Sequence, residues 1–272
     1  MKEIINGCEV YYEMFGYGKK VVFFHGFCVD SRLMTGCMEP IFSARNFCRI
    51  YIDLPGMGQS KQHDGIKNAD EMTALLAALI KKLLGNEEFF VAGESYGGYL
   101  SMGLVEHFGN QIGGIALVAP CVIANYKRRT LPEHGIVFED EALAAGQKNN
   151  PDFMAFRERA VIVTAETWER YKSDILPGIK AADMSFIAEY LEHGYGFSDE
   201  NRVFQQTFSG ALCVIVGKQD SVVGYLDAQK RFENYPRAEL IIIDGAGHNL
   251  QIEKPVEFEK SMGSWLNSIG DI

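Results

Sequence analysis

The fold is decided by the stretch Gly93-Glu94-Ser95-Tyr96-Gly97-Gly98, which contains the pattern G-x-S-x-G. An apolar run, Phe89–Gly93, leads into this stretch and predicts a buried strand, and a helix is predicted over Tyr99–Phe108. A sharp strand-to-helix turn needs glycine two positions before and two after its apex, because side chains there would collide across the turn. The apex residue, Ser95, would then project its hydroxyl out of the sheet. The pattern alone has low specificity, so the surrounding sequence must support it.

On both sides of this stretch, apolar strands alternate with helical patterns. The strands predicted before residue 121 are Lys20–Gly26, Arg49–Asp53, Phe89–Gly93 and Ile112–Ala119. Their apolar residues are continuous rather than alternating, which is typical of parallel strands that are covered on both faces. One intervening helix is marked by a capping pair, Asn68 and Glu71, and by a stop signal at Gly85. We therefore predict an α/β fold with a mostly parallel central sheet and helices on both faces.

The alternation stops after residue 120. Residues 121–209 contain one ambiguous apolar run, Ala160–Val163, and otherwise predict several helices that are rich in aromatic residues. We expect these aromatic side chains to form a core of their own.

Strand patterns return at Ala211–Gly217 and Glu239–Asp244, and a last helix is predicted to begin at Pro255. The sequence therefore predicts one α/β core that is interrupted by a helical insertion. The core comprises residues 1–120 and 210–272, and the insertion comprises residues 121–209.

Four further landmarks occur where one known fold family has its functional loops. They are His25-Gly26-Phe27 after an early strand, Asp53-Leu54-Pro55-Gly56-Met57-Gly58-Gln59-Ser60 after the next, Gly217-Lys218-Gln219-Asp220 after a late strand, and Gly245-Ala246-Gly247-His248 after the last. Together with the G-x-S-x-G turn, these landmarks make the chain resemble the α/β-hydrolase superfamily over its whole length apart from the insertion. The resemblance implies a serine hydrolase whose insertion forms a helical lid.

The resemblance also implies a role for each landmark. Ser95 would be the nucleophile, Asp220 the acid and His248 the base, in the chain order of this fold. A serine hydroxyl is a weak nucleophile, so a base must remove its proton as it attacks. An imidazole suits this task because its ordinary pKa of about 6.5 lets it accept and return a proton near neutrality. The backbone amides of Phe27 and Tyr96 are expected to bind the developing oxyanion.

Several nearby residues have other interpretations. Asp244 precedes His248 by only four residues and is the alternative acid. We expect His25 to be structural and bonded to nearby backbone, and Asp53 to tie down its own turn. Cys28 is expected to be a small core residue beside the oxyanion loop. The interpretation of Glu94 stays open between a contact with substrate and a contact with its neighbours.

Composition narrows the class of protein. Lys and Arg number 26 against 36 for Asp and Glu, which gives a net charge of -10 in 272 residues. An acidic surface repels phosphate backbones, so we expect no nucleic-acid partner. No apolar run approaches the roughly 18 residues that span a bilayer, and the N-terminus lacks a signal-peptide pattern, so a cytoplasmic protein is expected. The spacing of the 6 cysteines and 6 histidines supports free thiols and calls for neither a metal nor a cofactor.

The expected partners are a small-molecule acyl substrate and water. A lid encloses the site and so favours small or medium carboxylic esters or related acyl compounds, hydrolysed through an acyl-serine intermediate. Ser95 excludes the epoxide and haloalkane hydrolases of this superfamily, which use an aspartate nucleophile. A thioesterase, a C–C bond hydrolase and a proline-iminopeptidase-like peptidase stay open, although His25-Gly26-Phe27-Cys28-Val29 departs from the H-G-G-P-G of the last group. A ligand sensor or interaction protein on this scaffold is the alternative from another class of function.

Overall fold

The computed structural model describes residues 1–270, and an eight-stranded sheet forms its centre. The strand order is β1-β2-β4-β3-β5-β6-β9-β10. The strands are β1 (Lys2–Ile5), β2 (Cys8–Phe15), β3 (Lys19–Phe24), β4 (Phe47–Ile52), β5 (Phe89–Glu94), β6 (Ile112–Val118), β9 (Ala211–Gly217) and β10 (Ala238–Ile243). From β4 to β10 every neighbouring pair is parallel. This mostly parallel sheet confirms the predicted fold class.

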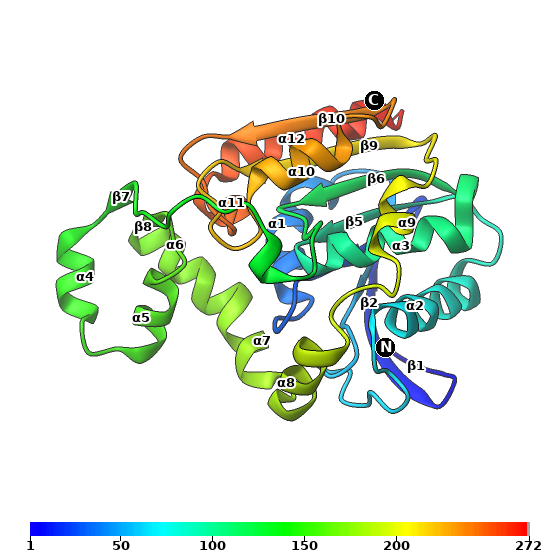
Figure 1. Ribbon diagram of the computed structural model, residues 1–272, viewed down its shortest axis with the longest axis horizontal. Helices are drawn as coiled ribbons and strands as arrows, with labels where there is room; N and C mark the ends of the chain where they lie inside the picture. The colour runs from blue at the N-terminus through cyan, green and yellow to red at the C-terminus, as the bar shows by residue number, and fades with distance from the viewer. Residues whose placement is uncertain (271–272) are drawn as a thin grey trace.

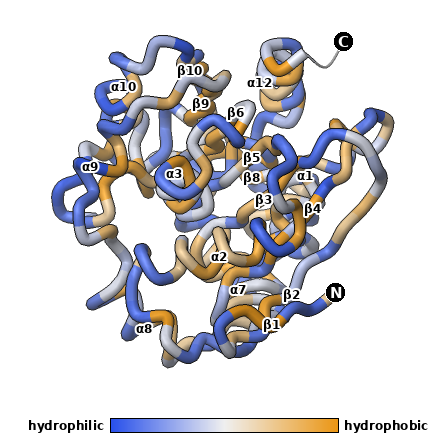
Figure 2. Tube along the Cα trace, turned by 90° about the vertical axis from the view of Figure 1, so that its right-hand side faces the viewer, coloured by the Kyte–Doolittle hydropathy of each residue, from blue (hydrophilic) through white to orange (hydrophobic). Residues whose placement is uncertain are grey.

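The strands lie where the continuous apolar runs predicted them, and the central ones are buried on both faces, whereas the edge strand β10 is partly exposed. Every residue of β4, β5 and β9 is buried. Figure 2 shows the hydrophobic residues gathered along the strands and the hydrophilic residues on the outer helices and turns. Parallel strands without a solvated face need such helical cover on both sides.

The N-terminal hairpin was not predicted, because its strands lack a continuous apolar run. β1 and β2 pair antiparallel, and β2 pairs antiparallel with β4. The two strands of the hairpin are joined by Asn6 and Gly7, whose φ values of 51° and 85° suit a tight hairpin turn. Burial alternates along β2, so its signal has a period of two rather than being continuous. The Asn-Gly pair in front of this alternating run was the signal that could have found the hairpin.

Helices cover both faces of the sheet (Figure 1). They are α1 (Arg32–Phe42) and α12 (Pro255–Ser268), which pack together on one face, and α2 (Ala69–Leu84), α3 (Tyr96–Phe108) and α10 (Tyr225–Phe232) on the other. The predicted cap of α2 is confirmed, since the Asn68 side chain accepts a hydrogen bond from the Glu71 amide, and Gly85 ends the helix with a φ of 60°. The predicted start of α3 at Tyr99 is wrong by three residues. Gly97 and Gly98 are poor helix formers, but the tight turn requires small residues inside the first turn of this helix.

Between β6 and β9 the chain forms the short helices of the predicted insertion. They are α4 (Glu141–Gln147), α5 (Pro151–Arg157), α6 (Ala165–Arg170), the π-helical turn η3 (Tyr171–Ile175), α7 (Leu176–Ala181), α8 (Met184–His193) and α9 (Glu200–Gln205). Side chains of Asp, Asn or Thr cap five of them at the N-terminus, namely Asp140, Asn150, Thr164, Asp183 and Asp199. The ambiguous run forms β8 (Ile162–Val163), which pairs with β7 (Phe138–Glu139). Figure 1 shows α4, α5 and α6 projecting to one side, where the arrowheads of β6 and β10 point.

The aromatic residues of the insertion divide between two cores, so the expectation of a separate core is only half right. Phe153, Phe156, Trp168 and Tyr171 form a second cluster together with Leu33 of α1 and Ile252. Phe186, Tyr190, Phe204 and Phe208 belong instead to the main core. The second half of the insertion is therefore anchored to the α/β core by its own apolar side chains.

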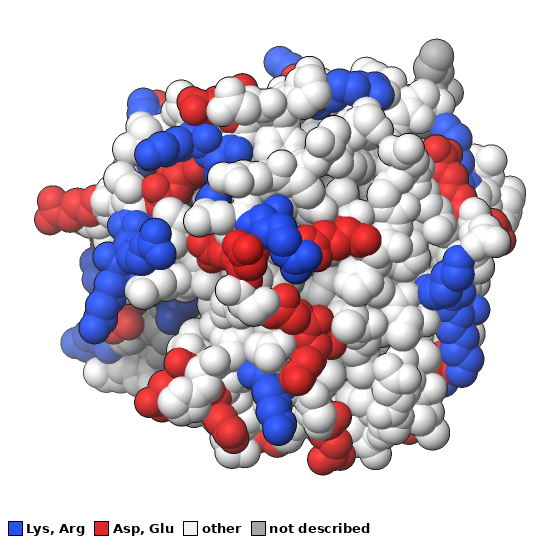
Figure 3. Space-filling view, turned by 45° about the vertical axis from the view of Figure 1, so that its right-hand side comes forward, with Lys and Arg blue, Asp and Glu red and all other residues white. Residues whose placement is uncertain are grey.

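The outer surface carries charges of both signs. Figure 3 shows lysine and arginine side chains next to aspartate and glutamate on the face that it presents. Surface side chains of opposite charge form ion pairs, such as Arg202–Glu106 and Lys180–Asp152. Among residues 1–270 no helix is both long enough and apolar enough to cross a membrane. Residues 271 and 272, the end of the predicted core segment 210–272, lie outside the described residues.

Candidate active site

Ser95 stands at the apex of a strained turn between β5 and α3. Its φ is 51°, in the left-handed region that non-glycine residues seldom adopt. A Cβ at position 93 would lie 2.4 Å from the carbonyl oxygen of Gly97, directly across the turn. A Cβ at position 97 would lie 2.4 Å from the carbonyl oxygen of Phe24 in β3. The glycines of the G-x-S-x-G pattern therefore leave no room for side chains, as the sequence predicts.

Gly97→Ala is expected to lower the free energy of unfolding by about 3 kcal/mol, because the new methyl group meets strand backbone that has little room to move. Urea denaturation of the two proteins measures this difference. Gly263→Ala is the matched control, since Gly263 lies inside α12 and a Cβ there meets nothing within 4 Å. That control should raise stability by about 1 kcal/mol. Equal stabilities of the Gly97 variant and the parent protein would contradict the packing argument.

Three side chains from three strand ends meet at this turn. Ser95 follows β5, Asp220 follows β9, and His248 follows β10. The Ser95 Oγ lies 3.0 Å from His248 Nε2, and the Asp220 Oδ2 lies 2.9 Å from His248 Nδ1. Because a carboxylate only accepts hydrogen bonds, Nδ1 carries the proton and Nε2 is left to accept the serine proton. The structure thus brings together the three residues that the sequence predicts as nucleophile, base and acid.

The acid is itself held in place. Asp220 is 1% exposed, and its Oδ1 accepts hydrogen bonds from the amides of Val222 at 2.8 Å and Val223 at 3.0 Å. These bonds leave Oδ2 for the imidazole. The alternative acid, Asp244, is exposed, and its carboxylate contacts Gln219 and Lys218 rather than His248.

The pKa of the His248 imidazole is raised from its ordinary value. Burial alone would lower the pKa of its imidazole, but the neighbouring carboxylates of Asp220 and Glu94 outweigh burial and raise the pKa. The charge of Arg159 acts in the opposite direction and lowers this pKa.

The oxyanion loop and the insertion meet in an aromatic cluster. Phe27 packs edge-on against Tyr96, with ring centroids 5.3 Å apart, and against Tyr195 at 5.1 Å. The Tyr96 hydroxyl lies 2.7 Å from the hydroxyl of Tyr190 in α8. Within residues 1–270 the backbone amides of Phe27 and Tyr96 make no hydrogen bond to protein. The amides predicted to bind an oxyanion thus come from two residues whose side chains contact the insertion.

The structural interpretations of His25 and Asp53 are confirmed. The buried His25 Nε2 accepts the Leu54 amide at 2.9 Å, so Nδ1 carries the proton and donates to the Gly26 carbonyl at 2.7 Å. Asp53 accepts the amides of Ser31 and Gln59, both at 2.8 Å. These bonds connect the loop that contains His25, Gly26 and Phe27 to the turn that follows Asp53.

Two further carboxylates lie near His248: Glu94, whose interpretation the sequence left open, and Glu253, which the sequence did not indicate. The Glu94 side chain is 4% exposed, and its Oε1 lies 3.5 Å from His248 Nε2. Glu253 is buried and accepts the amide of Gly247 at 2.6 Å and that of Val161 at 2.7 Å, so it ties the insertion to the histidine loop. A glutamate at the end of the fully buried strand β5 was the signal for Glu94. Glu253 has no comparable signal, because its partners are backbone amides, one of them 92 positions away in the sequence.

The thiols near the site are not activated. All six cysteines are free. Burial raises the pKa of the Cys28 thiol to about 11, so Cys28 is protonated at neutral pH. Within residues 1–270 no group of three or more His, Cys, Asp or Glu side chains is placed to hold a metal ion.

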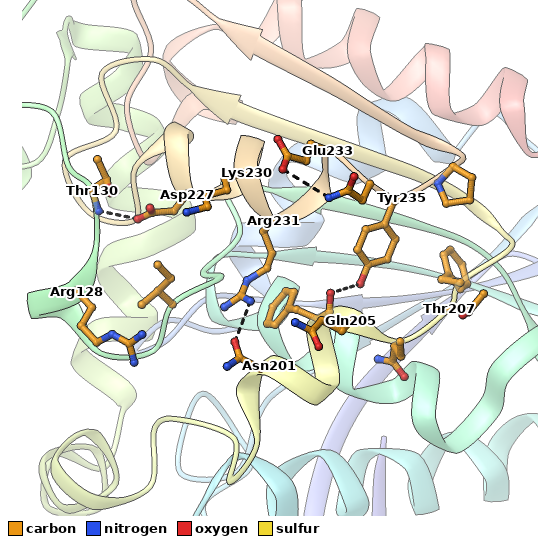
Figure 4. A pocket seen from close by; sticks show the side chains of 16 residues that line it. Arg128, Thr130, Asn201, Gln205, Thr207, Asp227, Lys230, Arg231, Glu233 and Tyr235 are labelled. Atoms are coloured by element: carbon orange, nitrogen blue, oxygen red, sulfur yellow. Dashed lines mark hydrogen bonds between the residues drawn. The ribbon is translucent and has the colours of Figure 1, made fainter.

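A surface cavity of about 730 Å³ lies away from these residues, between α9 and α10. Figure 4 shows its polar side chains bonded to protein groups: Arg231 donates to Asn201, and Asp227 accepts the amide of Thr130. Ser95, Asp220 and His248 do not line it. Ser95 is only 6% exposed, so the chemistry lies in a more enclosed part of the molecule than this cavity.

Comparisons with known proteins identify the family and the fold. Residues 18–255 match the family described as serine aminopeptidase, S33. An α/β superfamily hydrolase from Oenococcus oeni PSU-1 is 26% identical, with a TM-score of 0.89 and coverage of 99% of both chains. An esterase from Exiguobacterium antarcticum is 18% identical, with a TM-score of 0.77 and coverage of 98% of this chain and 99% of that one. A thermophilic esterase from Thermogutta terrifontis is 19% identical, with a TM-score of 0.72 and coverage of 99% and 98%. The likeness to the two esterases concerns the fold alone.

Proposed function

Because the chain belongs to the serine aminopeptidase S33 family of α/β hydrolases, we propose that it is a serine hydrolase of small or medium carboxylic esters and related acyl compounds. The observation that carries the proposal is the continuous hydrogen-bonded chain from Ser95 through His248 to Asp220. A surface serine would need neither a buried aspartate behind its histidine nor a strained backbone.

The proposed reaction proceeds in two steps. Ser95 Oγ attacks the acyl carbon while His248 Nε2 takes its proton, and Asp220 stabilises the imidazolium that forms. The amides of Tyr96 and Phe27 then bind the oxyanion, helped by the N-terminus of α3. His248 returns the proton to the leaving group, and an acyl-serine remains. Water attacks this ester with the same histidine as base, which releases the acid and restores Ser95.

We propose that residues 121–209 form a lid over this site. Three observations support a lid: the low exposure of Ser95, the contact of Tyr190 and Tyr195 with Phe27, and the bond of Glu253 to Val161. An enclosed site excludes water from the oxyanion and favours substrates that fit under the lid.

The family's description favours one second candidate, an aminopeptidase. An activity screen decides between the two candidates. Esters of graded acyl length are compared with thioesters and aminoacyl amides, and kcat/KM ranks them. Highest values on short esters support the proposal, whereas highest values on aminoacyl amides support the aminopeptidase. Tight binding of a ligand without sustained turnover of any substrate would instead indicate a sensor on this scaffold.

The proposed base implies a defined pH dependence. A histidine accepts the serine proton only when it is neutral, so kcat/KM on a neutral ester should rise with pH as His248 loses its proton. The midpoint is expected above 6.5, the ordinary pKa of the group, because the neighbouring carboxylates raise the pKa of His248. Initial rates from pH 5 to 9 measure the profile. A rate that does not change between pH 5 and 8 would contradict a histidine base.

A further inference from the structure

A buried carboxyl group lies beside the proposed base, and the mechanism above does not use it. The Glu94 Oε1 is 3.5 Å from His248 Nε2, the same nitrogen that lies 3.0 Å from Ser95 Oγ. The Glu94 side chain is 4% exposed and comes from the last residue of β5, directly before the nucleophile. Serine and glutamate therefore face a single nitrogen atom from adjacent positions in the chain.

The oxyanion loop makes room for this carboxyl group. A Cβ at position 26 would lie 2.2 Å from Glu94 Oε2, so the glycine of His25-Gly26-Phe27 permits the approach. Burial raises the pKa of Glu94 to about 7, although the charge of His248 and the Gly26 amide act to lower it. Glu94 therefore changes its protonation near neutral pH, and the pKa of His248 is raised from its ordinary value by the neighbouring carboxylates.

The charges around the pair are few. Asp220 faces His248 from the other side of the ring and raises the pKa values of both Glu94 and His248. Arg159 of the insertion lowers the pKa of His248. The buried Cys37 thiol of α1 lies within reach of the Glu94 charge, and burial raises its pKa far above neutrality, so it stays neutral. Of these groups, Glu94 is the carboxyl that faces Nε2.

We propose that Glu94 is a positioning residue whose carboxylate stabilises a proton on His248 Nε2, and so sets the pH at which this nitrogen becomes free to accept the Ser95 proton. The inference rests on the proposed function. One titrating proton resides on either the Glu94 carboxyl or the His248 imidazole. When the proton is on Glu94, Nε2 is free to accept the serine proton. When it is on Nε2, the imidazolium is stabilised by the Glu94 carboxylate, and the base is blocked.

Removing the carboxylate therefore frees the base at lower pH. In Glu94→Gln and in Glu94→Ala, the imidazolium loses its partner, and the midpoint of the acidic limb of kcat/KM should fall by about one pH unit. At a pH well below the midpoints of the parent protein and the variant, kcat/KM is expressed as a fraction of each protein's own plateau. This fraction should be about tenfold higher in the variants than in the parent protein. Two variants of different size separate loss of charge from loss of packing. Asp244→Asn is the matched control. It removes a carboxylate from the loop that carries His248, but this carboxylate contacts Gln219 and Lys218 rather than the imidazole, so the midpoint should equal that of the parent protein.

A second measurement does not need turnover. The ¹⁵N chemical shift of His248 Nε2, assigned by its loss in His248→Gln, is followed against pH in the full chain of the parent protein and of both Glu94 variants. The same downward shift of the midpoint supports the proposal. An unchanged or higher NMR midpoint in both Glu94 variants overturns it. A lower NMR midpoint in a protein that hydrolyses no acyl substrate would support this role of Glu94 and refute the proposed hydrolase function.

Discussion

Ser95→Ala is expected to lower kcat on short p-nitrophenyl esters by at least about 1,000-fold. The substitution removes the hydroxyl that lies 3.0 Å from His248 Nε2, so no acyl-enzyme can form at this position. The amides of Phe27 and Tyr96, which we propose as the oxyanion donors, are unchanged by the substitution, so a small residual rate is expected. Steady-state assays of parent protein and variant measure the ratio.

A second buried serine provides the control for this experiment. Ser101 lies in α3, one and a half turns beyond Ser95, and its hydroxyl donates to the Gly97 carbonyl at 2.6 Å. Ser101→Ala should cost about 1 kcal/mol of stability and change kcat/KM less than threefold, because this hydroxyl bonds only to its own helix. Equal rates for Ser95→Ala and the parent protein would end the serine mechanism.

Asp220→Asn is expected to lower kcat by about 10,000-fold, the loss that this change causes in a serine-protease triad. An asparagine amide donates a hydrogen bond to Nδ1, so the imidazole takes the tautomer with its proton on Nε2 and can no longer accept the serine proton. The bonds from Val222 and Val223 to Oδ1 can be kept by the amide oxygen, which preserves the turn. Steady-state kinetics together with a thermal melt separate lost catalysis from lost folding.

Asp244, the alternative acid, provides the control for the Asp220 substitution. Asp244→Asn should leave kcat within about twofold of the parent value, because Asp244 is exposed and contacts Gln219 and Lys218. A large loss in Asp244→Asn with normal activity in Asp220→Asn would reverse the assignment of the acid.

Three carboxylates surround the histidine loop, and each has a different partner. Asp220 accepts from the imidazole itself, Glu253 accepts from the neighbouring Gly247 amide, and Glu94 faces Nε2. All three are buried, so their partners distinguish them: Asp220 and Glu253 hold the loop by hydrogen bonds, and we propose that Glu94 tunes the protonation of His248. Such perturbed groups cluster at functional sites in many proteins.

The strand-end landmarks could be predicted because their signals are local. A continuous apolar run followed by a glycine-rich turn identifies β3, β5, β9 and β10, and the polar residue after each run must lie at the same edge of a parallel sheet. Ser95 follows from its glycine turn, and the resemblance to the α/β-hydrolase superfamily assigned Asp220 and His248 among the residues at the strand ends. The hairpin of β1 and β2 was missed for the opposite reason, since burial alternates along β2 and the strand lacks a continuous apolar run.

The amino-acid sequence alone therefore determined the α/β class, the order of the landmarks and the residues proposed for the chemistry, because secondary-structure period and turn glycines are properties of neighbouring residues. The tertiary structure decided how the oxyanion loop meets Tyr190 and Tyr195, how Glu253 joins the insertion to the histidine loop, and how Glu94 comes to share a nitrogen with Ser95. Those contacts join residues that lie up to 168 positions apart, as Phe27 and Tyr195 do, and their energies depend on burial and on distances of a few ångströms, which no local pattern encodes.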